Sequence, residues 1–370
     1  MSSHSQATPL GSPGPLGVGI LGAGPVTQAI HLPSLARLRN ILEVRHIMDV
    51  DSAVAESVAA RVGAKHSTSI DALLGDPDVD IVAICSPHQF HADQVIAACR
   101  AGKKAVLCEK PFAMSGEEAA RISAVSAETG VPIIVGAMHT FDPGWLAAEA
   151  NWGDLPENVH TIRSSIVLPP NARFEDFATE IITRPASGNP DYSDIEVIKN
   201  FLRGGIMGLA IHDLPLVRRF TPDFEDLEVL QARHVRPFGY VISLRSGKPG
   251  AGDRIIELRA AMNKTWKPEW VFEAISDDAA LRVDFTPSYV QAGSAAAIIT
   301  RGTTRTTYGP FEHNGYEGEW RELAQLALGT KQPPSAESLI NDLTFAIAIA
   351  DATVDLAAAE HANSHAGARS

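Results

Sequence analysis

A turn near the N-terminus has the residue types that bind phosphate. The apolar run at 16–20 leads directly into a Gly-Ala-Gly turn at 22–24, and a helical pattern begins at Pro25. In such a turn the first glycine permits a tight bend, the second lets the backbone approach a pyrophosphate, and the helix N-terminus favours the negative charge. Thr27 takes the place of a third glycine. We expect the phosphates of a nucleotide to bind at Gly22, Gly24, Pro25, Val26 and Thr27.

An acidic residue after the next strand supports a dinucleotide in this turn. Asp49 follows the apolar pattern at 44–48, about 20 residues beyond Thr27, where an acid binds the adenosine ribose hydroxyls. Asp51 adds a second negative charge, and no arginine follows until Arg61. Because these carboxylates repel a 2′-phosphate, we expect NAD rather than NADP. Without the acidic residue, the glycines could equally form a turn that has only a structural role.

Two polar motifs follow the next apolar runs. One comes after the run at 79–84 and the other after the run at 105–108. The carboxyl ends of parallel strands meet at one edge of an α/β sheet, where ligands bind. We expect these residues to border the cofactor: Ser86, Pro87, His88, His91, Glu109 and Lys110. The spacing of Cys85, His88 and His91 suggests zinc as an alternative, but a turn between strand and helix separates such side chains, and we expect no metal.

The order of these motifs resembles the Gfo/Idh/MocA family, which includes glucose–fructose oxidoreductase and inositol dehydrogenase. The resemblance rests on GILGAGPVTQAIHLPSL from Gly19, IVAICSPHQFHADQVIAACRAGKKAVLCEKPFA from Ile81 and GGIMGLAIH from Gly204. It implies that Lys110 lies beside the nicotinamide and that His212 faces the substrate. A buried ammonium stabilises a developing alkoxide, and an imidazole titrates near neutral pH. We expect Lys110 and His212 to be catalytic; a surface lysine and a core histidine are the alternatives.

Position 208 departs from the resemblance. Family members of the inositol dehydrogenase type have an aspartate four residues before the histidine, on the same helix face. This chain has Gly208 there. Asp213 is adjacent to His212 but would project about 100° around a helix, so it is a poor replacement. We therefore expect the substrate to be held differently, or the proton to leave by another route.

Further polar residues are candidate substrate contacts. His139 and Asp142 lie where the chain crosses into its second half, and a cap at the crossover is their alternative role. His313 and Tyr316 belong to a polar turn before a late helix. The candidate substrate contacts are His139, Asp142, Asp213, His313 and Tyr316.

The secondary-structure elements that position these residues follow one hydrophobic pattern in the first half of the chain and another in the second half. In the first half, short apolar runs alternate with helical segments, which predicts a parallel sheet covered on both faces. The strands are expected at 16–20, 44–48, 79–84, 105–108 and 132–136, and the helices near 26–38, 52–62, 91–101 and 115–129.

The second half is rich in β-strands. They are expected near 158–168, 228–245, 254–264, 269–276, 280–286 and 294–308, with helices near 143–151, after the glycine pair at 204–205, and near 316–329 and 335–360. The segment 169–200 contains several prolines, and loops of this length are usually functional or mobile. Arg173 and Tyr192 in this segment could close over a ligand.

The predicted fold class is α/β with two domains. We expect a flexible tail at 1–15, a Rossmann dinucleotide-binding domain at 16–140, an α+β domain with a large, mainly antiparallel open sheet at 141–361, and a second tail at 362–370. Because an open sheet face needs a cover, we expect a homodimer or homotetramer paired through the C-terminal sheet.

Composition excludes several classes of partner. The chain has 370 residues and a net charge of −13, with no basic block, so nucleic acid is not expected. Its 3 cysteines form no CxxC pair, which suits a reducing cytoplasm. The first residues lack the pattern of a signal peptide. Asp351 and Asp355 interrupt the apolar stretch 343–359, so we expect no membrane span.

The sequence favours an NAD-dependent dehydrogenase or reductase acting on CH–OH groups. Its substrate would be a secondary alcohol or ketone of a sugar, cyclitol or related small polar molecule. One alternative is an NAD-requiring lyase or glycosidase, which oxidises and re-reduces its substrate within one turnover. The other is a non-catalytic sensor of sugar or dinucleotide, motivated by Gly208.

Overall fold

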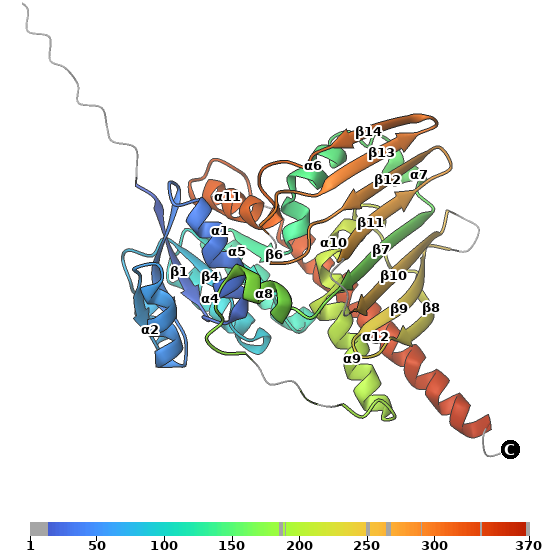
Figure 1. Ribbon diagram of the computed structural model, residues 1–370, viewed down its shortest axis with the longest axis horizontal. Coiled ribbons are helices and arrows are strands. Elements are labelled where there is room, and N and C mark those ends of the chain that lie inside the picture. Colours follow the sequence, from blue (N-terminus) through green and yellow to red (C-terminus); the bar gives the residue numbers. More distant parts are fainter. Residues whose placement is uncertain are drawn as a thin grey trace, which may run out of the picture.

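The first half of the chain forms a six-stranded parallel sheet in the order β3-β2-β1-β4-β5-β6 (Figure 1). The computed structural model describes residues 14–184, 188, 190–248, 252–263, 268–289, 291–333 and 335–367. The strands are β1 (Leu16–Leu21), β2 (Leu42–Met48), β3 (Lys65–Ser67), β4 (Ile81–Ile84), β5 (Ala105–Glu109) and β6 (Ile133–Gly136). The sequence pattern did not predict β3, because this strand is short and polar.

Helices cover both faces of this sheet, as the alternating pattern predicts. They are η1 (Thr27–His31), α1 (Leu32–Arg37), α2 (Ser52–Ala60), α3 (Ile70–Leu74), η2 (His88–Phe90), α4 (His91–Arg100) and α5 (Gly116–Thr129). The first predicted helix is divided, because η1 is a π-helix and α1 continues it as an α-helix. Helix α5 begins where Ser115 accepts a hydrogen bond from the Glu118 N–H and ends at Gly130 in the left-handed region.

The second half forms an eight-stranded sheet in the order β14-β13-β12-β11-β7-β10-β9-β8. Its strands are β7 (Thr161–Leu168), β8 (Leu227–His234), β9 (Gly239–Ser246), β10 (Arg254–Met262), β11 (Glu269–Ile275), β12 (Ala279–Asp284), β13 (Ala296–Arg301) and β14 (Thr304–Tyr308). Only β7 and β10 pair in parallel; the other pairs are antiparallel. The α/β fold class with a large, mainly antiparallel second sheet is therefore confirmed. Two predicted strands, 228–245 and 294–308, are each a pair of strands.

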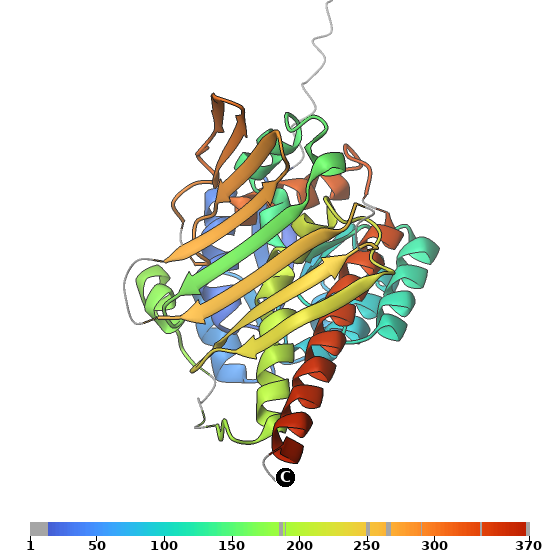
Figure 2. The same ribbon diagram turned by 90° about the vertical axis from the view of Figure 1, so that its right-hand side faces the viewer.

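One face of the large sheet packs on helices and the other has none in front of it (Figure 2). The packed face shares its core with α6 (Pro143–Glu149), α9 (Ile195–Gly208), α10 (Leu214–Arg218) and α12 (Ala336–Gly367). The outward face has exposed ion pairs, Arg163 with Glu257 and Arg282 with Glu273. Pairing of two copies through this face stays a prediction.

Helix α11 (Gly315–Ala327) returns from the second half to the first. Its Trp320 and Leu323 are fully buried in the core that contains β1 and the inner residues of β5. A Cβ on Gly315 would lie 1.9 Å from the Met138 carbonyl oxygen, so only glycine permits this close approach to η3 (Met138–Phe141). The N-terminal sheet is thus completed by a helix that the predicted range 16–140 leaves out.

Several predicted boundaries in the second half are wrong. Helix α8 (Ala172–Ala178) and the beginning of α9 fall within the segment 169–200, which was predicted as a loop, and α9 contains the glycine pair instead of following it. Gly205 lies inside α9, and the Tyr240 ring packs so closely against it that an added Cβ would lie 2.8 Å from the ring, which leaves no room for a side chain. The chain continues through α7 (Leu155–Asn158) and η4 (Ala210–His212).

Helix α12 extends into the range 362–367, which was predicted as a tail, while 368–370 and most of 1–15 lie outside the described residues. None of the helices in the described part of the chain combines the length and apolar character that crossing a membrane needs.

Candidate active site

The glycine turn has the backbone geometry that the sequence predicts. Gly22 has φ 95°, and a Cβ there would lie 2.7 Å from the Cys85 backbone, so the position requires glycine. Thr27 is fully buried, and its hydroxyl donates to the Gly22 carbonyl at 2.6 Å. No atom lies within 4 Å of where a Cβ on Gly24 would be. The turn is therefore held from inside and leaves open space on its outer side, where a phosphate can approach the backbone.

Asp49 is the residue directly after β2 and lies against the turn. One carboxylate oxygen accepts the Ala23 N–H at 2.7 Å, and the other accepts the Asp51 N–H at 3.0 Å. Each oxygen keeps a further lone pair for a hydroxyl donor. Asp51 caps α2 by accepting from Ala53 and Val54. The two acids therefore meet at the carboxyl edge of the sheet beside the phosphate turn.

The motif after β4 is tied to the motif after β5 through His91. Its Nδ1 lies 2.8 Å from the Pro111 carbonyl oxygen and its Nε2 lies 2.8 Å from the Ser86 carbonyl oxygen. Both ring nitrogens are therefore occupied by backbone atoms, so His91 positions the two loops and has no nitrogen directed at a ligand. The prediction that His91 contacts the cofactor stays a prediction. Partial desolvation, followed by the charges of His91 and Lys110, lowers the pKa of His88.

Lys110 connects the two halves of the molecule. Its partly buried side chain donates from Nζ to the Gly208 carbonyl oxygen at 2.8 Å, at the end of α9. Burial lowers the pKa of Lys110, and the neighbouring Glu109 carboxylate opposes this effect. The carbonyl that Lys110 contacts is four residues before His212, so the interaction places the ammonium beside the segment with the imidazole.

Glu109 is held by a buried histidine that sequence reasoning missed. Its Oε1 lies 3.0 Å from His31 Nε2, and its Oε2 accepts the Lys110 N–H at 3.2 Å. The indole N–H of Trp320 in α11 donates to His31 Nδ1 at 3.2 Å. Since an indole only donates, Nδ1 is unprotonated and the Nε2–H donates to Glu109. Helix α11 thereby fixes the residue next to Lys110.

His212 lies in η4 and is 6% exposed. Its Nδ1 is buried and has no hydrogen-bond partner among the described residues. Burial lowers the pKa of His212 well below 6.5, and the charges of Lys110 and His139 lower it further. The expectation of titration near neutral pH is therefore wrong: burial and positive neighbours keep this imidazole neutral, and able to accept a proton, at neutral pH.

The aspartate after His212 makes its hydrogen bonds to residues other than His212, among them His139. Asp213 is fully buried and accepts from His139 Nδ1 at 2.7 Å, from the Ser164 hydroxyl at 2.6 Å and from the Trp270 indole at 2.9 Å. The structure thus brings His139 next to His212, with ring centroids 6.1 Å apart. Asp213, predicted as a substrate contact, lies behind His139 instead.

Of the remaining candidate contacts, Asp142 has structural partners, whereas Tyr316 and His313 are described by their burial. Asp142 caps α6 through the Gly144 N–H at 2.8 Å and accepts the Ala295 N–H at 3.0 Å, which fits the alternative role of a crossover cap. Tyr316 is buried, and burial raises its pKa well above the usual value. Burial and the charge of Arg321 lower the pKa of the half-buried His313.

The segment after α8 lies across the start of the first helix. The Ile182 N–H donates to the Gln28 side chain at 3.2 Å, and Arg61 donates to the Glu180 carbonyl at 2.9 Å. Figure 1 shows α8 in front of the N-terminal sheet. Tyr192, suggested as a ligand cover, instead donates to the Pro237 carbonyl and stacks on His234. Arg173 is in α8 itself.

A cavity of about 450 Å³ lies between β6 and helices α10 and α12, with Lys110 at its wall. Arg218 and Asp342 form an ion pair there at 3.0 Å, and burial raises the pKa of Asp342 to about 6. The lining includes neither His139 nor His212. Lys110 therefore borders this cavity, but the two histidines do not.

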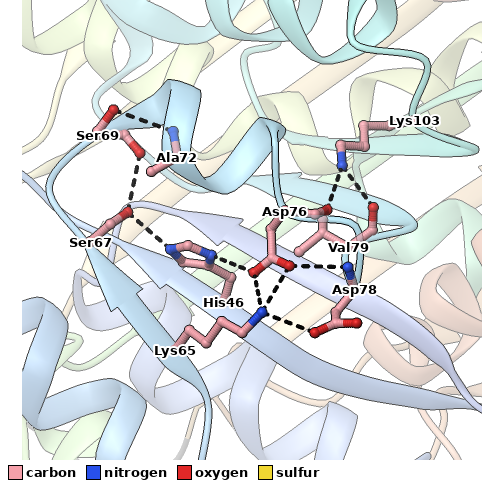
Figure 3. Close-up of polar contacts among 9 residues, drawn as sticks. All are labelled: His46, Lys65, Ser67, Ser69, Ala72, Asp76, Asp78, Val79 and Lys103. Atoms are coloured by element: carbon pink, nitrogen blue, oxygen red, sulfur yellow. Dashed lines mark hydrogen bonds and ion pairs between the residues drawn. The ribbon is translucent and has the colours of Figure 1, made fainter.

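A charged network of the first half includes Asp76 and Asp78, which lie before the start of β4, together with His46 and Lys65 (Figure 3). Asp76 contacts His46 at 2.9 Å and Lys65 at 2.9 Å, and Lys65 also contacts Asp78 at 2.9 Å. Asp76 and Asp78 precede β4, whereas Asp49 follows β2. Burial alone would raise the pKa of Asp76, but hydrogen bonds from the Asp78 backbone, Lys65 and His46 lower it to about 2. This network is part of the scaffold, and it reaches Asp49 only through Ser67, whose hydroxyl contacts His46 and whose carbonyl accepts the Asp49 N–H.

Comparison with known proteins gives one family match. Residues 16–137 match the Gfo/Idh/MocA model, an oxidoreductase family with an NAD-binding Rossmann fold. An inositol 2-dehydrogenase of Saccharopolyspora erythraea is 38% identical over 129 residues, which are 35% of this chain and 38% of the relative. An inositol 2-dehydrogenase of Acidothermus cellulolyticus is 35% identical over 225 residues, 57% of this chain and 65% of the relative. The chain thus matches less than two thirds of the length of either relative.

Solved structures share the fold over most of the chain. A UDP-N-acetylglucosamine 3-dehydrogenase from Acidithiobacillus ferrooxidans superposes with a TM-score of 0.69 at 19% identity, covering 93% of this chain and 99% of that one. A 3-ketoreductase from Actinomadura kijaniata, in complex with NADP, gives a TM-score of 0.67 at 21% identity, covering 90% and 96%. At these identities the likeness establishes the fold alone, with a parallel sheet followed by a large, mainly antiparallel sheet.

Proposed function

Residues 16–137 belong to the Gfo/Idh/MocA oxidoreductase family, and from this premise we propose that the chain is an NAD-dependent oxidoreductase. Its substrate is a secondary alcohol or ketone of a sugar, a cyclitol or a related polar molecule. The observation that carries the proposal is the contact of Lys110 Nζ with the Gly208 carbonyl. This contact places an ammonium from the dinucleotide-binding half beside the segment that holds a buried, neutral His212.

The residues at the carboxyl edge of the sheet fit a dinucleotide. The open side of Gly24 accepts the pyrophosphate, and Asp49 accepts the ribose hydroxyls. We propose NAD rather than NADP because Asp49 and Asp51 stand together, and because the next arginine along the chain, Arg61, is bonded to Thr179 and Glu180. The bound nicotinamide would supply a hydride acceptor in oxidation and a hydride donor in reduction.

The side chains supply the proton and charge chemistry of alcohol oxidation. His212, neutral because its pKa is lowered, takes the proton of the substrate hydroxyl. The ammonium of Lys110 faces the oxygen and stabilises the negative charge that develops there. As the carbon–hydrogen electron pair leaves, the oxygen forms the carbonyl bond of the ketone. In the reductive direction the proton returns from His212 to the oxygen.

Turnover with a panel of polar alcohols tests this function. NAD is incubated with myo-inositol, D-glucose and D-xylose, while nicotinamide absorbance and substrate loss are followed together. Growth of the NADH band with equimolar ketone is expected. Substrate loss without NADH would indicate the lyase or glycosidase instead, and tight dinucleotide binding without any turnover would indicate a sensor.

We also propose a homodimer or homotetramer paired through the outward face of the large sheet, and a cytoplasmic location. The face has no helix in front of it in Figure 2, and the thiols of Cys85, Cys99 and Cys108 are all free. Sedimentation analysis of wild type and Arg163→Glu, which reverses a charge on this face, tests the pairing. A monomeric wild type would contradict it.

A further inference from the structure

A second cavity adjoins the one that Lys110 borders. It has a volume of about 230 Å³ and lies between α5, β6 and the start of α12. Both cavities are lined by Phe112 and Leu339, so they meet at these two side chains. We refer to the larger one as the Arg218 cavity and to the smaller one as the apolar cavity. Among the described residues, neither His212 nor the glycine turn lines either of them.

The Arg218 cavity is rich in positive charge although the chain as a whole is acidic. The net charge of the chain is −13, yet four basic and two acidic side chains line this cavity. They are Lys110, Arg218, Arg219, Lys331, Glu322 and Asp342. A cavity with this balance of charge favours a negatively charged ligand group.

Three of the four basic groups already have partners. One donates to a backbone carbonyl, and the other two form ion pairs with acidic side chains. The contacts are Lys110 with the Gly208 carbonyl at 2.8 Å, Lys331 with Glu322 at 2.6 Å and Arg219 with Glu149 at 3.2 Å. The fourth basic group, Arg218, differs from them.

Arg218 is buried and keeps a donor without a partner. Its side chain is 13% exposed, and its Nε lies 3.0 Å from a carboxylate oxygen of Asp342. Its guanidinium lies over the Phe224 ring, 5.6 Å from the centroid. Nη1 is buried and has no hydrogen-bond partner among the described residues. Because a buried N–H is normally paired, Nη1 indicates a ligand oxygen at this end of the cavity, and a single available donor matches a ligand with one negative charge.

The apolar cavity has a different character. Among the described residues, no charged side chain lines it. Ile122 of α5, Ile133 of β6 and Ile340 of α12 contribute to its lining. Phe112, where the two cavities meet, is almost fully buried. The pair of cavities is therefore cationic at one end and uncharged at the other.

We propose that the two cavities together bind one medium-chain monocarboxylic acid. Its carboxylate accepts a hydrogen bond from Arg218 Nη1, and its hydrocarbon chain passes Phe112 and Leu339 into the apolar cavity. A guanidinium binds a carboxylate through a charge-assisted hydrogen bond, and burial of methylene groups stabilises the chain. This ligand site lies outside the dehydrogenase chemistry and does not rest on the proposed function, although its charged end borders Lys110.

Calorimetric titration with octanoate, octan-1-ol and butanoate tests the proposal. The titrations use wild type without NAD or a polyol, so their outcome is independent of the proposed function. Octanoate should bind at least about tenfold more tightly than octan-1-ol, because only the anion forms a charged hydrogen bond with the guanidinium. Each buried methylene tightens binding by up to about fourfold, so octanoate should also bind at least about tenfold more tightly than butanoate.

Two substitutions at the charged end have opposite expected effects. Arg218→Gln should reduce the preference for octanoate over octan-1-ol to within about threefold of unity. Asp342→Asn removes the carboxylate that competes for Arg218 and should tighten octanoate binding by about threefold or more, which a misfolded protein could not do. Arg203→Gln is the matched control and should keep the wild-type affinities, since Arg203 is exposed and pairs with Asp351 of α12 outside both cavities.

A third substitution tests the uncharged end. Ser123 is half-buried and lines the apolar cavity, so Ser123→Phe fills this space. Octanoate should then bind no more than about threefold more tightly than butanoate, whose affinity should not change. A wild type that binds neither acid, or that binds octan-1-ol as tightly as octanoate, would overturn the proposal. An Arg218→Gln protein that keeps the preference for octanoate, or a Ser123→Phe protein that keeps the dependence on chain length, would overturn it as well.

Discussion

Replacing Lys110 with methionine removes the ammonium and keeps the apolar stem. In the structure Nζ makes one hydrogen bond, to the Gly208 carbonyl at 2.8 Å. Losing this hydrogen bond lowers the free energy of unfolding by about 1 kcal/mol. The loss is offset because folding no longer has to remove water from the Lys110 ammonium. In catalysis the loss is larger, because one donor to a developing oxyanion contributes about 10²–10³ in kcat, or about 3–4 kcal/mol. We therefore expect kcat to fall by about 10²–10³-fold while the Kd for NAD changes less than about threefold.

The assay is NADH formation at saturating NAD and substrate, with NAD affinity measured separately by calorimetry. The chain offers a matched control at the other end of the same strand. Lys103 is also buried, and it donates to the Asp76 and Val79 carbonyls at 3.2 and 2.8 Å. Lys103→Met should lower the free energy of unfolding by about 1–3 kcal/mol and leave kcat of the folded enzyme unchanged. The reasoning would be refuted if Lys110→Met kept kcat within tenfold of wild type. It would also be refuted if kcat fell as far in Lys103→Met as in Lys110→Met.

Three further predictions concern proton transfer, cofactor binding and the scaffold. Because the pKa of His212 is lowered, kcat/KM of wild type should fall only as the pH drops well below 6.5. His212→Asn should lose this acidic limb of the pH–rate profile and about 10²–10⁴ in rate. A pH–rate profile of both enzymes checks the two expectations. Asp49→Asn should raise the Kd for NAD about tenfold and the Kd for NADP by a smaller factor, both measured by calorimetry. An unchanged Kd for NAD would mean that the ribose binds elsewhere. A pKa lowered from 3.8 to about 2 means that Asp76 stabilises the fold by about 2 kcal/mol above pH 4, and that this contribution is lost as the pH falls toward 2. Urea unfolding of Asp76→Asn should show that deficit at pH 7 and a smaller one near pH 3, and equal stability at pH 7 would contradict it.

The N-terminal sheet could be predicted from sequence because its signals are local. The apolar runs, the glycine turn and Asp49 each lie within a few residues of the element that they mark, and the structure has them in the predicted order. Lys110 could be placed for the same reason, directly after a strand. The strand Lys65–Ser67 escaped prediction because three polar residues carry no periodic signal.

The partners of the candidate residues could not be predicted, because they come from distant segments. Asp213 and His139 are separated by 74 positions, and His31 and Glu109 by 78. No pattern along the chain marks such a pair, and the estimate that Asp213 projects away from His212 could not say which residues it contacts instead. The glycine pair in α9 was misjudged similarly, since only the Tyr240 ring explains why a helix accepts glycine there.

A crystal structure of the enzyme with NAD and a polyol bound tests the central claim most directly. The account predicts an adenine dinucleotide on the Gly22 turn, with Lys110 Nζ and a nitrogen of His212 both within hydrogen-bonding distance of one substrate oxygen beside the nicotinamide. A nicotinamide bound away from Lys110, or a substrate oxygen that reaches neither side chain, would contradict it.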